Sequence, residues 1–220
     1  MTTALVTLMG VAPALAKDFL SGQPYFGITM MLTAAANADI SSAPRALEPA
    51  FHINNPQLGT DTGYGVIGTL GWLFDNNWRV EAEIGHRQLG LNRIVSYFDT
   101  TSLDGTLDVT TTLVNVVKDF RGKSFITPYF GLGVGVGFHK IKLGSIAGVR
   151  PSFGTQQDGF SIVYQALLGV NFEVGEDLDL VVGYRFLGDL DPDFGAFALK
   201  RLDIHSFDIG IKFYFEDWGG

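Results

Sequence analysis

The sequence predicts an all-β protein, an eight-stranded antiparallel up-and-down transmembrane β-barrel. The 220-residue chain is 46% hydrophobic and only 17% charged, with 28 glycines and a mean hydropathy of +0.21. A membrane-spanning helix needs about 20 mostly apolar residues, and the best stretch, 19–38, is interrupted by Pro24, Gly27 and polar side chains. Apolar side chains instead alternate with small or polar ones. In lipid, a closed barrel is the other structure that pairs all of its backbone groups.

Composition excludes several classes of protein. The absence of cysteine excludes disulfide scaffolds, thiol enzymes and cysteine-ligated zinc sites. A net charge of -8 argues against nucleic acid as a partner, because such proteins need a basic face. The chain is too apolar and aromatic to remain disordered. We expect one barrel domain without a cofactor.

The first residues resemble a secretory signal peptide. Residues 1–16 carry no charge and end in Ala14-Leu15-Ala16, a small-x-small cleavage site, directly before Lys17. The basic residues that usually precede the apolar core are missing, so we expect the true signal to start further upstream. This predicts a signal peptide over 1–16 and an outer-membrane β-barrel over 17–220.

The first four strands are expected at about 24–33, 62–74, 78–87 and 107–120. Each has a period of two, with one face suited to lipid. The third strand is the clearest, because its apolar face alternates with charged side chains that lipid cannot accept. The expected lipid-facing residues of these strands are Phe26, Ile28, Met30, Leu32, Tyr64, Val66, Leu70, Trp72, Phe74, Trp78, Val80, Ala82, Ile84, Val114, Val116 and Phe120.

The last four strands are expected at about 128–139, 161–173, 178–186 and 206–215. In the first of these, four alternating glycines from Gly131 to Gly137 occupy the lumen face, where they leave space. The expected lipid-facing residues are Pro128, Phe130, Leu132, Val134, Val136, Phe138, Ile162, Tyr164, Ala166, Leu168, Val170, Phe172, Leu178, Leu180, Val182, Tyr184, Phe186, Phe207, Ile209, Ile211, Phe213 and Phe215. Aromatic residues gather at both ends of the strands, as expected for interfacial girdles.

Connections between the expected strands alternate in length. Turns of roughly three or four residues alternate with longer connections, as in outer-membrane barrels with short periplasmic turns and longer extracellular loops. An even strand number then places both termini in the periplasm. Charged residues share a face with the glycines, and from this we exclude the packing of a soluble lipocalin-type barrel, which is apolar inside.

A polar network is expected in the lumen, which side chains can fill in a barrel of this size. Buried charges must be paired, so the first interpretation is a salt-bridge plug. The alternative is a narrow path for small ions or solutes. A diffusion porin is not expected, since such channels need about 16 strands. The expected lumen residues are Arg79, Glu81, Glu83, Arg87, Asn115, Gln165, Glu173, Asp179, Arg185, Asp208 and Lys212.

Three segments resemble the opacity-type surface antigens, which are OmpA-like eight-stranded outer-membrane barrels: Trp78–Gly85, Thr127–Gly135 and Val182–Phe186. The resemblance covers about 62–215. The last strand is similar to the signal that the barrel assembly machinery reads, through Asp208, Gly210, Phe213 and Phe215, although 216–220 follow the usual terminal phenylalanine. We do not expect the peptidoglycan-binding domain that some members append.

The resemblance implies an exported, monomeric surface protein of the bacterial outer membrane. Its expected partners are outer-membrane lipid and lipopolysaccharide, the barrel assembly machinery and an extracellular ligand of the loops. The longest loop, about 34–61, is the candidate adhesive or antigenic site, because loops carry binding function more often than scaffolds do. The alternative is a variable loop without a fixed ligand.

Two further chemistries receive little support. Asp189, Asp191 and Asp193 resemble the start of a calcium loop, but Gly195 comes one residue late, so solvated loop acids are the simpler interpretation. A lipid A-modifying enzyme would need an outward histidine and serine on one face. His205 is expected to face outward, but Ser206 then points inward, and His86 has no serine beside it. We therefore expect no enzyme activity.

Overall fold

The computed structural model describes residues 22–36, 38–42, 57–95, 100–146, 156–193, 198–199 and 201–215. The expected signal peptide lies outside these residues. The strands are β1 (Gln23–Ala35), β2 (Ala38–Ser42), β3 (Gln57–Thr60), β4 (Gly63–Leu73), β5 (Trp78–Val95), β6 (Thr100–Asp119), β7 (Ile126–Ile146), β8 (Gln156–Glu173), β9 (Leu178–Asp193), β10 (Ala198–Leu199) and β11 (Arg201–Tyr214). Within this part of the chain, no helix is long and apolar enough to cross a membrane.

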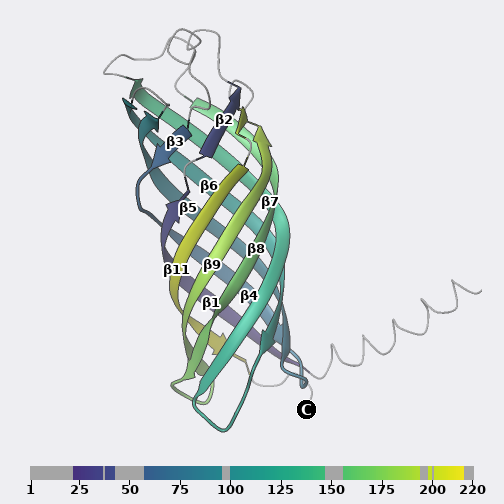
Figure 1. Ribbon diagram of the computed structural model, residues 1–220. Helices are drawn as coiled ribbons and strands as arrows, with labels where there is room; N and C mark the ends of the chain where they lie inside the picture. The colour runs from purple at the N-terminus through teal and green to yellow at the C-terminus, as the bar shows by residue number, and fades with distance from the viewer. Residues whose placement is uncertain are drawn as a thin grey trace, which may run out of the picture.

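Eight long strands close into a tall barrel of steeply inclined strands (Figure 1). The antiparallel ring runs β1–β4–β5–β6–β7–β8–β9–β11 and closes where β11 pairs again with β1. The short strands β2, β3 and β10 pair with one another and with β5 and β9, so they continue β1, β4 and β11 towards one end. The predicted eight-stranded all-β barrel is confirmed.

At the end of the barrel that carries β2, β3 and β10, the strands are longer than expected. Residues 34–61 were expected to form one loop, but they include the end of β1 and all of β2 and β3. β5 continues to Val95, β6 begins at Thr100 and β7 continues to Ile146. The expected strand ends were placed where the apolar alternation stops on the lipid face. In the structure, the alternation continues there with the opposite phase.

The membrane section is the part of the barrel whose outward side chains are apolar. Met30 and Val134 are 67% and 65% exposed, whereas inward polar side chains of the same section, such as Asn115 and Gln165, are buried. Aromatic rings gather at both edges, with Tyr184 against Phe207 and Phe213 against Phe215 at centroid distances of 5.7 Å each. This face has the character that lipid requires.

The outer section comprises β2, β3, β10 and the adjoining ends of the longer strands, from Gln88 on β5, up to Asp108 on β6 and from Lys140 on β7. Where the structure describes them, the outward side chains of the longer strands here are mostly polar, such as Asn92, Asp104 and Lys142, and the inward ones are mostly apolar. Together with neighbours just below, the inward side chains form the outer apolar cluster: Leu89, Leu91, Leu103, Leu107, Val109, Leu113, Ile141, Leu143, Val163, Leu187, Leu202 and Ile204. The exclusion of lipocalin-type packing is therefore wrong for the outer section, although it holds for the membrane section.

The opposite end of the barrel carries tight turns. In the turn after β4, the Phe74 amide donates to the Trp78 carbonyl at 2.8 Å, and Asn77 has a φ of 62°. Asparagine tolerates this left-handed conformation better than most residues. The Phe215 amide donates to the Pro24 carbonyl at 2.9 Å, so both ends of the described barrel lie on this side.

Candidate functional site

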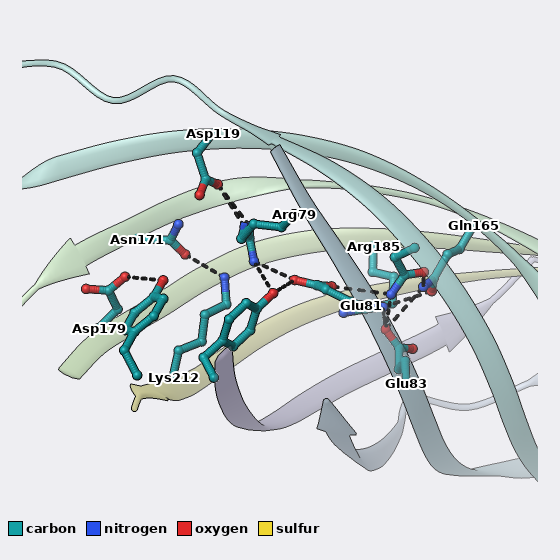
Figure 2. Close-up of polar contacts among 12 residues, drawn as sticks. Arg79, Glu81, Glu83, Asp119, Gln165, Asn171, Asp179, Arg185 and Lys212 are labelled. Atoms are coloured by element: carbon teal, nitrogen blue, oxygen red, sulfur yellow. Dashed lines mark hydrogen bonds and ion pairs between the residues drawn. The ribbon is translucent and has the colours of Figure 1, made fainter. Parts of the chain in front are cut away.

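The lumen of the membrane section contains two connected layers of polar side chains (Figure 2). In the layer nearer the tight turns, the Arg79 guanidinium lies between Asp119 and Glu81. Its Nη2 is 3.0 Å from Asp119 Oδ1, and its Nη1 donates to Glu81 and, at 2.9 Å, to the Tyr25 hydroxyl. All of these side chains are buried. Strands β1, β5 and β6 are thereby joined across the interior.

Lys212 extends this layer on the opposite wall. Its Nζ donates to Asn171 Oδ1 at 3.0 Å and lies over the rings of Tyr25 and Tyr129, at 5.7 and 5.1 Å from their centroids. Asp179 accepts a hydrogen bond of 2.9 Å from the Tyr214 hydroxyl. Aromatic faces stabilise a cation that water reaches poorly. Glu173 differs from the other expected lumen residues, because it is exposed at the end of β8.

Arg185 is the centre of the second layer. Its Nη1 donates to Glu83 Oε2 at 2.6 Å and to Gln165 Oε1 at 2.8 Å, and its Nε donates to Asp208 Oδ2 at 3.0 Å. Asn115 Nδ2 completes the layer by donating to Glu83 Oε2 at 2.9 Å. One guanidinium thus pairs two buried carboxylates, which is the condition for placing such charges in the interior.

Lumen glycines make room for these long side chains. A Cβ at Gly133 would overlap Asn115 and crowd Gln165 Cγ at 3.0 Å, and a Cβ at Gly71 would overlap the ring of Tyr25. The glycines of β4 and β7 therefore define the space that the polar layers occupy.

Arg87 lies deeper towards the outer section and is fully buried. Its Nη1 donates to Thr111 Oγ1 at 3.2 Å, while its Nε and Nη2 have no hydrogen-bond partner among the described residues. At longer range the Arg185 charge is unfavourable, whereas those of Glu83 and Asp208 are favourable. Among the expected lumen residues, Arg87 has the most buried polar atoms without a hydrogen-bond partner in the described structure.

A histidine cluster that sequence reasoning did not assemble lies beside Arg87. His139 Nε2 is 2.9 Å from Ser161 Oγ and 3.3 Å from Asp189 Oδ2, and Ser161 donates to the same carboxylate. The same ring nitrogen contacts both partners, so the carboxylate does not orient the imidazole as the acid of a catalytic triad does. The cluster forms because β7, β8 and β9 pair side by side. The only sequence signal for it is that His139 falls on the inward face of its strand.

Asp189 also corrects the expectation that the three aspartates are solvated loop acids. It lies on β9 and points into the lumen, buried beside His139, instead of standing in a solvated loop. The side chains of Asp191 and Asp193 lie outside the described residues. No group of three or more potential metal-binding side chains occurs in the part of the chain that the structure describes.

The outer apolar cluster covers the polar layers on the side away from the tight turns. Leu89, Leu107 and Leu187 are among its members with at most 1% exposure. A packed set of leucines offers no partner to a hydrated ion, so passage through it would require desolvation. The described interior is a polar core under an apolar cap.

The two outward histidines occupy the lipid-facing surface of the barrel. His86 Nδ1 is 3.0 Å from Thr110 Oγ1, and His205 Nδ1 is 2.5 Å from the Tyr184 hydroxyl. Ser206 is buried and points into the lumen, as the alternation predicted. Among the described residues, neither histidine is therefore placed beside a serine on its own face.

The closed ring of eight antiparallel strands, its apolar outward band and the packed polar side chains inside it define a transmembrane β-barrel with a filled lumen. The family described as "Outer membrane protein beta-barrel domain" matches residues 2–215. The chain belongs to this family, and it is a β-barrel protein of the bacterial outer membrane.

Relatives and a solved structure agree with this assignment. The chain is 26% identical over 211 residues to an "Outer membrane protein" of Gluconacetobacter diazotrophicus, and the matched region covers 90% of this chain and 55% of the relative. It is 31% identical over 149 residues to a Rickettsia conorii protein named "Putative adhesin RC1281", covering 63% of this chain and 60% of the relative. The chain thus spans little more than half the length of these relatives.

The crystal structure of Neisserial surface protein A is similar with a TM-score of 0.59 and 18% identity, covering 87% of this chain and 97% of that one. At this identity the similarity shows the fold alone. The opacity-type resemblance is thereby confirmed at the level of an eight-stranded outer-membrane barrel.

Proposed function

We propose that this protein is a monomeric, non-enzymatic surface protein whose barrel anchors its outer loops for contact with an extracellular ligand. The filled interior is the observation that carries the proposal. The Arg185 and Arg79 layers occupy the lumen of the membrane section, and the outer apolar cluster caps them. With the interior occupied by packed side chains, the surface beyond the membrane is where binding takes place.

In this proposal the tight turns and both termini face the periplasm, and the outer section faces the cell exterior. The alternation of short turns with longer outer connections supports this orientation. Lipid and lipopolysaccharide contact the apolar outward band, and the barrel assembly machinery reads Asp208, Gly210, Phe213 and Phe215. The relative named as an adhesin supports a binding role for the loops.

Cell attachment tests the proposal directly. Bacteria that express the protein are compared with vector-only cells on surfaces coated separately with fibronectin, laminin and heparin. We expect several-fold more cells on at least one surface, and a return to the vector level when residues 43–56 are replaced by a short Gly-Ser linker. Replacing 96–99 in the same way is the matched control. Equal attachment by wild-type and vector-only cells on all three surfaces would contradict the proposal.

A low-conductance channel is the second candidate, favoured by the polar side chains of the membrane section. We expect purified protein in planar bilayers to show no stable single-channel openings, because the leucine cap excludes hydrated ions. Stable openings that disappear in both Glu83→Ala and Arg185→Ala would instead establish conduction through the polar layers. Heat-modifiable gel migration verifies that each variant is a folded barrel.

A further inference from the structure

A groove of about 480 Å³ lies on the lipid-facing surface of the membrane section. It crosses β4, β1 and β11, with Tyr64 and Phe207 on either side of Leu32. Leu32 and Tyr64 are each 65% exposed and Phe207 is 70% exposed. Met30 and Ile209 continue the apolar lining towards the centre of the band.

The ladder between β1 and β4 is interrupted directly above this groove, while β1 stays paired with β11 as far as Ala35↔Ile204. The β1–β4 pairs end at Thr33↔Gly63, and pairing resumes between the short strands β2 and β3 at Ala38↔Leu58. In the interval, the Ala35 carbonyl accepts a hydrogen bond of 3.0 Å from the Thr60 hydroxyl. We call this interval, residues 34–36 and 59–62, the seam.

Polar groups surround the upper end of the groove and the seam. The Tyr64 hydroxyl and the His205 imidazole lie at the two sides, and both are amphipathic rings of the kind that suit an interface. Beyond the groove, towards the outer section, Asp61 is exposed just before β4 and Asp203 is half-buried on β11. Arg93 is also exposed, on β5. The rim therefore carries both signs of charge.

An apolar groove below a polar rim of both charge signs matches one kind of molecule. A zwitterionic phospholipid has an apolar chain, ester carbonyls at the interface and a headgroup with one phosphate and one ammonium. In the proposed orientation, its chain points towards the bilayer centre and its headgroup reaches the seam. A lipid A headgroup carries two phosphates and no compensating ammonium, so it fits this rim less well.

We propose that the β4–β1–β11 face is a specific lipid site, which holds one acyl chain of a zwitterionic phospholipid between Tyr64 and Phe207 with its headgroup on the seam. Elsewhere on the band, side chains such as Leu132 and Val134 on β7 are also well exposed to lipid, at 57% and 65%. They provide the internal reference for general contact with the bilayer.

Photocrosslinking tests this site. The protein is reconstituted in phosphatidylcholine vesicles that contain a small fraction of phosphatidylethanolamine with a diazirine on its acyl chain, and labelled residues are mapped by mass spectrometry. We expect at least fivefold more labelling on β1, β4 and β11 groove residues than on β7. Even labelling around the barrel would overturn the proposal.

Two pairs of variants make the test independent of any single substitution. Leu32→Trp fills the groove, and Phe207→Ala removes one of its walls. Each should reduce groove labelling about fivefold, while the controls Val134→Trp and Phe138→Ala leave it unchanged. Heat-modifiable gel migration confirms folding. Unchanged labelling in a folded Leu32→Trp or Phe207→Ala variant would contradict the site, and complete displacement of the probe by equimolar lipid A would contradict the zwitterionic headgroup.

Discussion

The two sections of this barrel solve the same packing problem with opposite chemistry. In the membrane section, polar layers around Arg185 fill the interior and apolar side chains face out. In the outer section, the outer apolar cluster fills the interior, and Lys140, Lys142 and Asp158 face out. One continuous set of strands serves both. The comparison teaches that solvent decides which face is apolar, whereas strand geometry only requires that the faces alternate.

The largest effect is expected where the second polar layer loses its central cation, Arg185. Arg185→Met leaves Glu83 and Asp208 buried without their partner, which should lower the free energy of unfolding by about 3–5 kcal/mol. The measurement is urea unfolding in vesicles, followed by tryptophan fluorescence. The triple variant Arg185→Met, Glu83→Gln, Asp208→Asn should recover a large part of this loss. A triple variant as unstable as the single one would show that charge burial is not the cause.

The same truncation should have different effects in the two sections. Leu107→Ala leaves a cavity in the outer apolar cluster and should cost about 2–5 kcal/mol. Leu132→Ala removes a lipid-facing side chain whose place lipid can fill, so no cavity is left and the cost should be clearly smaller than for Leu107→Ala. Both are measured by the same urea unfolding. Equal losses would mean that the outer section is not packed as a protein core.

A charge introduced on the outward face should destabilise the membrane section more than the outer section, which is the reverse of the order expected for the leucine truncations. Val134→Arg places a cation on the lipid face and should cost about 2–4 kcal/mol near the bilayer midplane. Thr106→Arg, on the outward face of the outer section, should stay within about 0.5 kcal/mol of wild type. Unfolding of the two variants in one vesicle preparation checks the contrast. A tolerated Val134→Arg would displace the proposed membrane band.

The smallest effect concerns the polar surface of the outer section. Burial raises the pKa of Asp108, but hydrogen bonds from Lys142 at 2.9 Å and Gln88 at 2.8 Å outweigh it and hold that pKa below its ordinary value. Lys142 is half-exposed, so Lys142→Met should cost only about 0.5 kcal/mol.

Because the folded-state pKa of Asp108 is lowered, its contribution to stability is present above the unfolded pKa of about 3.9. It is lost as pH falls through the folded value. The difference between wild type and Lys142→Met, measured by urea unfolding between pH 7 and pH 2.5, should therefore vanish at the acid end. In an Asp108→Asn background the substitution should have no effect at any pH.

The membrane section could be predicted from sequence because lipid and lumen impose a strict period of two. The outer section was missed although it has its own signal. On β5 the apolar residues are even-numbered through Ile84 and odd-numbered from Leu89, and on β7 they switch between Phe138 and Ile141. The expected strands end near this change of parity. In the structure it marks the position where the surrounding solvent changes.

Individual partners in the lumen could not be predicted in the same way. Arg185 and Glu83 are 102 residues apart, and Ser161 and Asp189 join His139 from two other strands. Which inward side chains meet depends on the register and stagger of all eight strands, which alternation alone does not specify.

The pairing of β1 with β11 has a kinetic consequence. These strands come from opposite ends of the described chain, and a hydrogen bond from Gln23 to Phe215 spans 192 positions. Contacts so distant in sequence form slowly, because the entropy of a very long loop must be lost first. Until the last strand arrives, β1 and β9 both remain open edges that can pair with any other strand. The chain is therefore most vulnerable to aggregation just before its final strand docks.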